Sequence, residues 1–202
     1  MHNGLRKLVD GYQRFRARYA AGEDSHMTQL SVQGQSPSCM IVACSDSRVD
    51  PSIILQCDPG DLFVVRNVAN LIPPYEHNSG HHGVSAALEF GVRYLNVQHL
   101  IILGHSQCAG IAARWQGDLV GDTDFISDWV SLIDTPPHPG EHPDDYAKKA
   151  LECSRTNCLS FPWIKERVLA NTLTLHTWFF DIHQAQLFTK HHGVWTELAS
   201  ET

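Results

Sequence analysis

Short apolar runs that stop at polar turns are the clearest pattern along this chain. Met40–Ala43 is such a run, and the Ser-Asp-Ser segment after it predicts a buried strand followed by a turn. Phe63–Arg66 and His99–His105 predict two more strands. Leu173–Ile182 and Ala185–Thr189 are rich in β-branched and aromatic residues, which predicts a closing hairpin.

Helical patterns lie between these strands and before the first one. Leu5–Ala20 has apolar residues at helical spacing with basic residues around them, which predicts an amphipathic helix. Further helices are predicted at Val84–Leu95, Ala109–Trp115, Gly121–Ile133, Pro143–Leu159 and from Pro162 onward. The alternation of strands and helices predicts an α/β fold with a mainly parallel sheet flanked by helices. We expect an N-terminal helical arm over residues 1–30 and a single α/β domain over 31–202, closed by the C-terminal hairpin.

Side chains suited to chemistry follow the first strand. Cys44, Asp46 and Arg48 alternate just past its end. Open parallel sheets bind ligands at the carboxyl ends of their strands. Because Asp46 and Arg48 are two residues apart, their side chains can project to the same side of extended backbone and form an ion pair.

His105 and Cys108 stand at the end of another predicted strand, where the chain turns into a helix. Together with Cys44 they form a set of thiolate and imidazole ligands suited to zinc. The sequence offers Asp46 or a water molecule as the fourth ligand. An open or exchangeable position is typical of a catalytic zinc, whereas a closed site would only stabilise the fold.

The same residues carry a family resemblance. Cys44–Arg48, His105–Cys108 and the linking segment Pro59–Asn70 resemble the β-class carbonic anhydrases. Looser matches continue to Trp195, so the resemblance covers nearly the whole chain. It implies the β-carbonic anhydrase fold in residues 31–202, as a zinc-binding catalytic domain, and a self-associated protein that is a dimer or an assembly of dimers.

The implied reaction is the zinc-dependent, reversible hydration of carbon dioxide to bicarbonate and a proton by zinc-bound hydroxide. Cys44, His105 and Cys108 would hold Zn²⁺. Asp46, kept ionised by Arg48, would accept a hydrogen bond from the hydroxide and orient it. The same carboxylate could instead leave Arg48, become the fourth zinc ligand and close the site.

By the same resemblance, Gln35, Phe63 and Val68 would line the carbon dioxide pocket at a subunit interface. Phe63 and Val68 are also ordinary core residues by type, and both roles can hold at once. The bicarbonate-inhibited branch of the family has a tryptophan three residues before the first cysteine ligand, where this chain has Ile41. Together with Gln35, this favours the plant and bacterial type of branch, with an open site at neutral pH.

Several alternatives stay open at this point. The resemblance extends to enzymes that hydrolyse carbonyl sulfide or carbon disulfide, and a non-catalytic partner protein could keep the zinc for folding. The N-terminal helix could pack on its own domain, although the family implies contact with a partner subunit. His77, His81 and His82 form either a proton relay at the pocket mouth or a solvent-facing loop.

Composition limits the classes of partner. The chain has 202 residues, 43% of them hydrophobic, which is enough for a full core. Its formal charge of −7 argues against a nucleic acid or an anionic membrane as partner. No export leader or membrane-length apolar run is recognisable, so we expect a cytoplasmic protein. The six cysteines do not require a disulfide framework in a chain of this size.

Overall fold

The computed structural model describes residues 3–22, 25–78, 80–117 and 123–198. The chain divides into two compact units, residues 1–36 and residues 37–202. Each unit is described by itself below. The division falls six residues after the end of the predicted arm.

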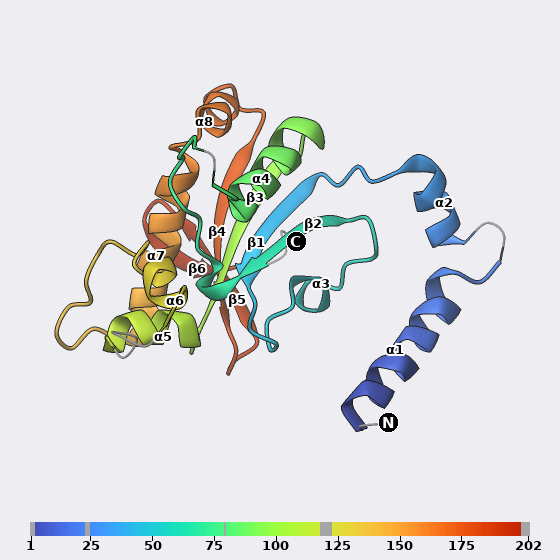
Figure 1. The fold of residues 1–202 in the computed structure, drawn as a ribbon, viewed down its shortest axis with the longest axis horizontal. Helices are drawn as coiled ribbons and strands as arrows, with labels where there is room; N and C mark the ends of the chain where they lie inside the picture. Colours follow the sequence, from blue (N-terminus) through green and yellow to red (C-terminus); the bar gives the residue numbers. More distant parts are fainter. Residues whose placement is uncertain (1–2, 23–24, 79, 118–122, 199–202) are drawn as a thin grey trace. The chain divides into compact units, whose positions relative to one another are not determined.

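The larger unit alternates strands and helices, as the sequence predicts (Figure 1). Its strands are β1 (Cys39–Cys44), β2 (Leu62–Asn67), β3 (His99–His105), β4 (Thr174–Asp181), β5 (Gln186–His191) and β6 (Val194–Glu197). Its helices are α3 (Pro51–Ile54), α4 (Gly83–Glu89), α5 (Ala109–Gln116), α6 (Ile126–Val130), α7 (Pro143–Cys158) and α8 (Pro162–Leu169). A 3₁₀ turn at Val68–Asn70 and a π-helical turn at Phe90–Tyr94 complete it.

The strands form one sheet in the order β2-β1-β3-β4-β5-β6. The first four are parallel, and β5 and β6 are antiparallel additions at one edge. The mainly parallel sheet and the β4–β5 hairpin are therefore confirmed. The strand β4 also completes the parallel sheet by pairing with β3, and β6 is an edge strand that the sequence did not reveal.

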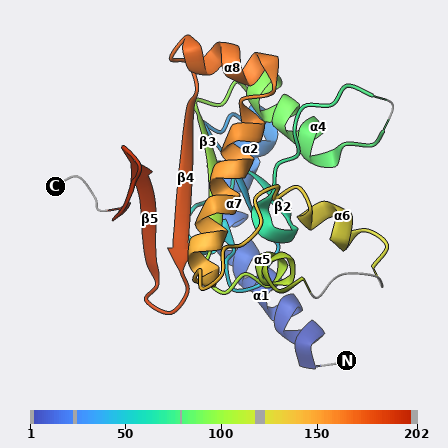
Figure 2. The same cartoon turned by 90° about the vertical axis from the view of Figure 1, so that its left-hand side faces the viewer.

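One face of the sheet is covered by helices, and α7 lies along β3 and β4 (Figure 2). Met40, Val42, Leu100 and Ile102 are buried on this face in the main core cluster. Gly104 allows the close approach of α7, since a Cβ atom there would lie 3.0 Å from Leu151 Cδ1.

The opposite face of the sheet buries a second, smaller cluster. Ile41, Ala43, Ile101 and Leu103 form it, and partly buried aromatic and leucine side chains pack around them. Because β1 and β3 are buried on both faces, they read as continuous apolar runs in the sequence. Such runs made these strands predictable.

The N-terminal unit contains α1 (Asn3–Tyr19) and α2 (His26–Gln33). Ser25 caps α2 by accepting a hydrogen bond from the Thr28 backbone N–H. The apolar stripe of α1 is exposed, with Leu8 at 70% and Tyr12 at 56%. Among the described residues, no helix is both long enough and apolar enough to span a membrane.

One predicted helix is wrong in extent. The prediction ran from Gly121 to Ile133, but α6 covers only Ile126–Val130, and residues 121–122 lie outside the described residues. The backbone N–H groups of Leu132 and Ile133 bond carbonyls three residues back, as in a tightening turn, so the helix ends there. The remaining predicted helices are present, with the one from Val84 ending in the π-helical turn.

Candidate metal centre

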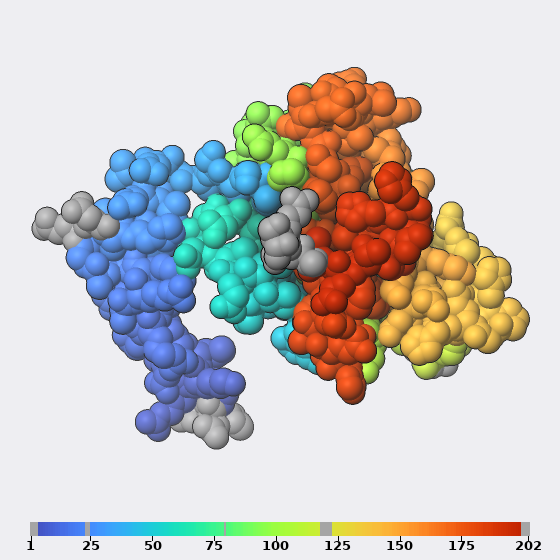
Figure 3. Space-filling model, turned by 180° about the vertical axis from the view of Figure 1, so that it is seen from behind, coloured from blue at the N-terminus to red at the C-terminus, as the bar shows by residue number. Residues whose placement is uncertain are grey.

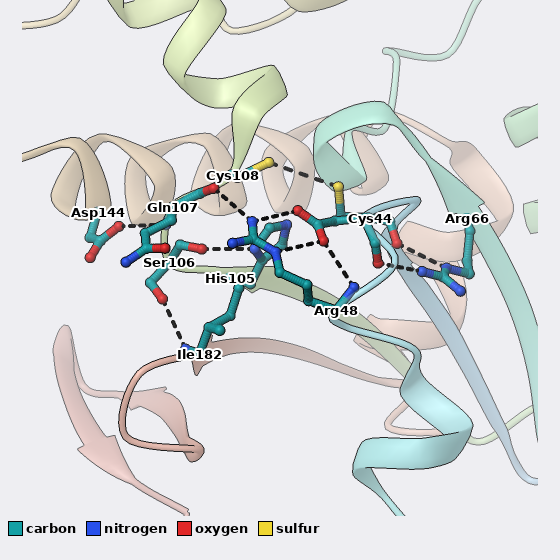
Figure 4. A network of polar contacts seen from close by, with 10 residues as sticks. Cys44, Arg48, Arg66, His105, Ser106, Gln107, Cys108, Asp144 and Ile182 are labelled. Atoms are coloured by element: carbon teal, nitrogen blue, oxygen red, sulfur yellow. Dashed lines mark hydrogen bonds and ion pairs between the residues drawn. The ribbon is translucent and has the colours of Figure 1, made fainter.

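Two cysteines and a histidine converge at the carboxyl edge of the sheet (Figure 4). The parallel register aligns Ala43 of β1 with Leu103 of β3, which brings Cys44 and His105 to the same edge. Cys108 follows on the turn into α5. The ligand atoms of all three lie within 4.8 Å of one another, and all three residues are buried.

The separation of the sulfurs fits a tetrahedral metal. Cys44 Sγ and Cys108 Sγ are 3.8 Å apart. Two sulfurs bonded to one zinc ion at about 2.3 Å, with a tetrahedral angle between them, are also about 3.8 Å apart. The donor set of two soft sulfurs and one imidazole nitrogen is one that proteins use for zinc.

The histidine presents a single nitrogen to this group. His105 Nδ1 lies 2.8 Å from the Ser106 carbonyl oxygen, and donating to that oxygen fixes the tautomer. The other nitrogen, Nε2, is buried and has no hydrogen-bond partner. A buried imidazole nitrogen left unpaired is costly, and a metal ion would satisfy it. Ser106 is itself held between β3 and β4, because its Oγ accepts from the Ile182 N–H.

Without a metal, the proton shared by the two thiols stays on Cys108 and Cys44 is the thiolate. The hydrogen bond from Cys108 is the main cause that lowers the pKa of Cys44, to about 4, with His105 assisting. The same bond, together with burial, raises the pKa of Cys108. Thiolate is the form that binds metal, so one ligand is already in that form and a cation would compete for the proton on the other.

A strained turn at Gln107 connects the ligands His105 and Cys108. Gln107 has a φ of 56°, in the left-handed region that residues with a Cβ atom rarely adopt. Two bonds hold it there: its N–H donates to Asp144 Oδ1 at 3.1 Å, and its carbonyl accepts from Arg48 Nη2 at 3.2 Å. The turn directs the chain into α5, whose first position follows Cys108.

The predicted Asp46–Arg48 pair is present and has two contacts between the side chains. Arg48 Nε donates to Asp46 Oδ1 at 2.9 Å, and Nη2 donates to Oδ2 at 2.7 Å. These hydrogen bonds hold the pKa of the Asp46 carboxyl far below its usual range. Asp46 is thus ionised and directed at Arg48, and among the described residues no fourth side chain joins the three ligands.

Arg66 is a residue whose role the sequence did not reveal. Its guanidinium donates to the Cys44 carbonyl at 2.9 Å and to the Asp46 carbonyl at 2.7 Å. It also pairs with Asp50 at 2.7 Å. Arg66 therefore positions the backbone on both sides of Ser45 and holds the first ligand loop against β2. The sequence signals for this role were a cation at the end of a predicted strand and its place in the segment Pro59–Asn70.

The predicted pocket residues lie on β2 and just after it. Phe63 is half-buried and stacks on Phe90 with ring centroids 5.7 Å apart. Val68 is 38% exposed and packs on the first turn of α5, where a Cβ on Gly110 would come 2.7 Å from Val68 Cγ1. Gln35 belongs to the N-terminal unit and is exposed.

A cavity of about 550 Å³ opens between α4 and α6. His81, His82, Phe125 and Trp129 are among the residues that line it. Trp129 Nε1 donates to the Val68 carbonyl at 2.7 Å, so one wall of this cavity is tied to a predicted pocket residue. The proton-relay role of His81 and His82 stays a prediction.

Comparison with known proteins decides the family. The carbonic anhydrase family model matches residues 39–187. This chain belongs to the β-carbonic anhydrase family. It is 39% identical over 158 residues to β carbonic anhydrase 5, chloroplastic, of Arabidopsis thaliana, covering 73% of this chain and 52% of that protein. The chain thus spans about half the length of that relative. It is 31% identical to β carbonic anhydrase 3 of the same plant, over 89% of this chain and 74% of the relative.

Solved structures of the family share the fold. The β-carbonic anhydrase CcaA superposes with a TM-score of 0.84 at 30% identity, over 98% of this chain and 93% of that one. Tetrameric β-carbonic anhydrases from Sordaria macrospora give a TM-score of 0.73 at 27% identity, over 96% of this chain and 100% of theirs. The β-carbonic anhydrase fold expected from the sequence is therefore confirmed.

Proposed function

We propose that this chain catalyses the reversible hydration of carbon dioxide to bicarbonate and a proton, at a zinc ion held by Cys44, His105 and Cys108. The observation that carries the proposal is the donor set itself. Its sulfurs stand at the tetrahedral zinc separation of 3.8 Å, and His105 Nε2 is buried without a partner. Membership of the β-carbonic anhydrase family supports the reaction.

The chemistry divides between the cofactor and the protein. When bound, zinc would supply a Lewis acid that lowers the pKa of water from about 15.7 to about 7. Asp46 would accept a hydrogen bond from the attacking oxygen and so aim its lone pair at the carbon of CO₂. Arg48 would keep Asp46 ionised and fixed in that orientation. Because a carboxylate paired with arginine is a weak base, Asp46 would orient the nucleophile rather than remove its proton.

The substrate is small and apolar, so we propose that an apolar wall receives it. Phe63 and Val68 would form that wall, and Gln35 would complete the pocket with a polar amide. A dry pocket strengthens the electrostatic interactions of the ionised groups beside it.

We propose further that the site is open at neutral pH, as in the branch that lacks the tryptophan. Ile41 occupies the corresponding position on β1 and is fully buried in the smaller cluster. Both oxygens of Asp46 bond Arg48, which opposes its use as a fourth zinc ligand. This ion pair is the main support for the open site.

Self-association and location are also proposals. The exposed apolar stripe of α1 suits contact with a second copy of the chain, and the Sordaria macrospora relatives are described as tetrameric. Sedimentation of the zinc-loaded protein at micromolar concentration should show a dimer or an assembly of dimers. A cytoplasmic location stays a prediction, since one relative is named chloroplastic.

The test is stopped-flow CO₂ hydration by the protein as purified, after removal of metal by a chelator, and after zinc is restored. We expect hydration to be lost with the metal and recovered with zinc. Carbonyl sulfide and carbon disulfide are assayed in parallel. Absence of CO₂ hydration by zinc-loaded protein would reject the proposal, and turnover of a sulfur substrate by the same protein would replace it.

A further inference from the structure

Two histidines meet at the amino ends of β3 and β4, away from the candidate metal centre. His99 Nδ1 lies 3.2 Å from His176 Nε2, and the ring planes are inclined by 50°. Both side chains are half-buried. His99 begins the strand that His105 ends, so the two positions are separated by about 20 Å along β3, at about 3.3 Å per residue.

The distance between the two nitrogens suits a shared metal ion as well as a shared proton. Two imidazole nitrogens bonded to one tetrahedral zinc ion at 2.0–2.1 Å lie about 3.3–3.4 Å apart. The pair could therefore accept a cation in place of the proton between them, with each ring tilting so that its lone pair points at the metal.

A third histidine is placed on the next strand by the sheet register. His176 is aligned with Ile101 on β3, so it shares a sheet face with Ile101 and His99. The β4–β5 ladder pairs Trp178 with Thr189 and stops there. Continued by two residues along each strand, the same register sets His176 opposite His191. Three neighbouring strands thus each place one histidine on the same face.

The surroundings leave room for a cation to enter. Beyond the end of the β4–β5 ladder lies a cavity of about 470 Å³, lined by His176 and His191 and also by Glu152 and Arg155 of α7 and by Lys190. His99 lines an adjacent cavity of about 530 Å³. The C-terminal strands form part of the surface of the larger unit (red in Figure 3). Burial is the main cause that lowers the pKa of His176, with His99 and His191 contributing, and this favours the neutral imidazole that binds metals.

We propose that His99 and His176, joined by His191, form a second metal site for a divalent transition cation such as zinc. His99 and His176 lie on the sheet face that carries Ile101 and Leu103, and the cavity beside them is also lined by residues of α7. A cation there would link β3, β4 and β5 where the β4–β5 hydrogen bonds have ended. Imidazole-only ligation suits zinc, copper and nickel, and it differs from the thiolate centre in having no sulfur.

Equilibrium dialysis of the full-length protein against zinc tests the proposal. We expect about two zinc ions per chain in the wild type and about one in His176→Ala, with CO₂ hydration unchanged. His183→Ala, which removes an exposed histidine from the β4–β5 turn, is the matched control and should keep both zinc ions. His176→Gln keeps the side-chain size and a hydrogen-bonding group, so it covers the case in which the alanine variant folds poorly.

Cobalt distinguishes the two sites by colour. Cobalt bound by Cys44 and Cys108 gives strong sulfur-to-metal charge-transfer absorption, whereas a histidine site does not. Cobalt added to the protein with zinc at the thiolate centre should therefore bind without those bands, and His99→Ala should abolish that binding. A single metal equivalent in the wild type, or a second equivalent that survives both His99→Ala and His176→Gln, would overturn the proposal. If His183→Ala lost the second metal equivalent to the same extent as the His99 and His176 variants, the result would show adventitious binding only.

Discussion

The strand β3 carries a histidine at each end, and the two ends are built differently. At the carboxyl end, the Ser106 carbonyl holds His105 in one tautomer and its free nitrogen is buried with two thiols. At the amino end, the His99 imidazole bonds the imidazole of His176, beside strands whose ladder has stopped. The first site is fixed before any metal arrives, whereas the second must gather its ligands. Pre-organisation should therefore make the carboxyl end much the tighter metal site.

The largest effect is expected from removing a thiolate. Cys108→Ser should reduce bound zinc at this centre to near zero and lower CO₂ hydration by about 1,000-fold or more, because a serine hydroxyl is a poor zinc ligand. Metal analysis and stopped-flow hydration measure the two losses. Cys57→Ser changes a half-buried thiol outside the centre and should keep both zinc and activity. Zinc retained by Cys108→Ser would contradict the assigned ligand set.

A smaller loss is expected from the ion pair. Asp46→Asn should keep zinc but lower hydration by about 100-fold, because a neutral amide accepts a weaker hydrogen bond from the nucleophile and pairs weakly with Arg48. Glu89→Gln, which breaks the exposed pair with Arg93, is the control and should leave zinc content and hydration unchanged. If Asp46→Asn instead lost its zinc, the carboxylate would have a structural role in place of the catalytic one.

The next largest loss is expected from replacing Arg66, which supports the backbone of the ligand loop. Arg66→Met should lower zinc affinity or hydration by about 10- to 100-fold, since it frees the Cys44 and Asp46 carbonyls from their shared donor. Competition with a chelator measures the affinity. Arg93→Met is the matched control on an exposed helix surface. An Arg66→Met variant with unchanged affinity and rate would show that the ligand loop does not depend on this guanidinium.

The smallest effect concerns stability and pH. Arg48 lowers the pKa of Asp46 in the folded protein, so the ion pair contributes its full stability above the unfolded value of about 4 and loses it as pH falls toward the lower folded value. The stability advantage of the wild type over Asp46→Asn should therefore be constant near neutrality and shrink below about pH 4. Urea unfolding of both proteins at several pH values measures it. An advantage that grew toward acid pH would reverse the assigned sign.

The sequence predicted the parts of the molecule that depend on local pattern. The strands β1 and β3 follow from apolar runs buried on both faces, and His105 and Cys108 follow from their position at a strand end. The Asp46–Arg48 pair follows from a spacing of two. Each of these features needs only residues close together in the chain.

Features that depend on distant backbone were not predictable. Arg66 donates to backbone carbonyl groups. Because every residue has a carbonyl group, the sequence does not show which ones Arg66 will bond. His99 and His176 are 77 residues apart and meet only through the register of β3 with β4. The strand β6 is short and follows a glycine turn, and the end of α6 is set by turn hydrogen bonds rather than by a breaker residue.

The measurement that tests the central claim most directly is the pH profile of kcat/KM for CO₂ hydration by the zinc-loaded protein, from about pH 6.5 to 9. The account predicts fast hydration that rises with a single ionisation near or somewhat above pH 7, with Asp46 remaining on Arg48 throughout. A steep collapse of activity below about pH 8 would show instead that Asp46 leaves Arg48 and closes the site.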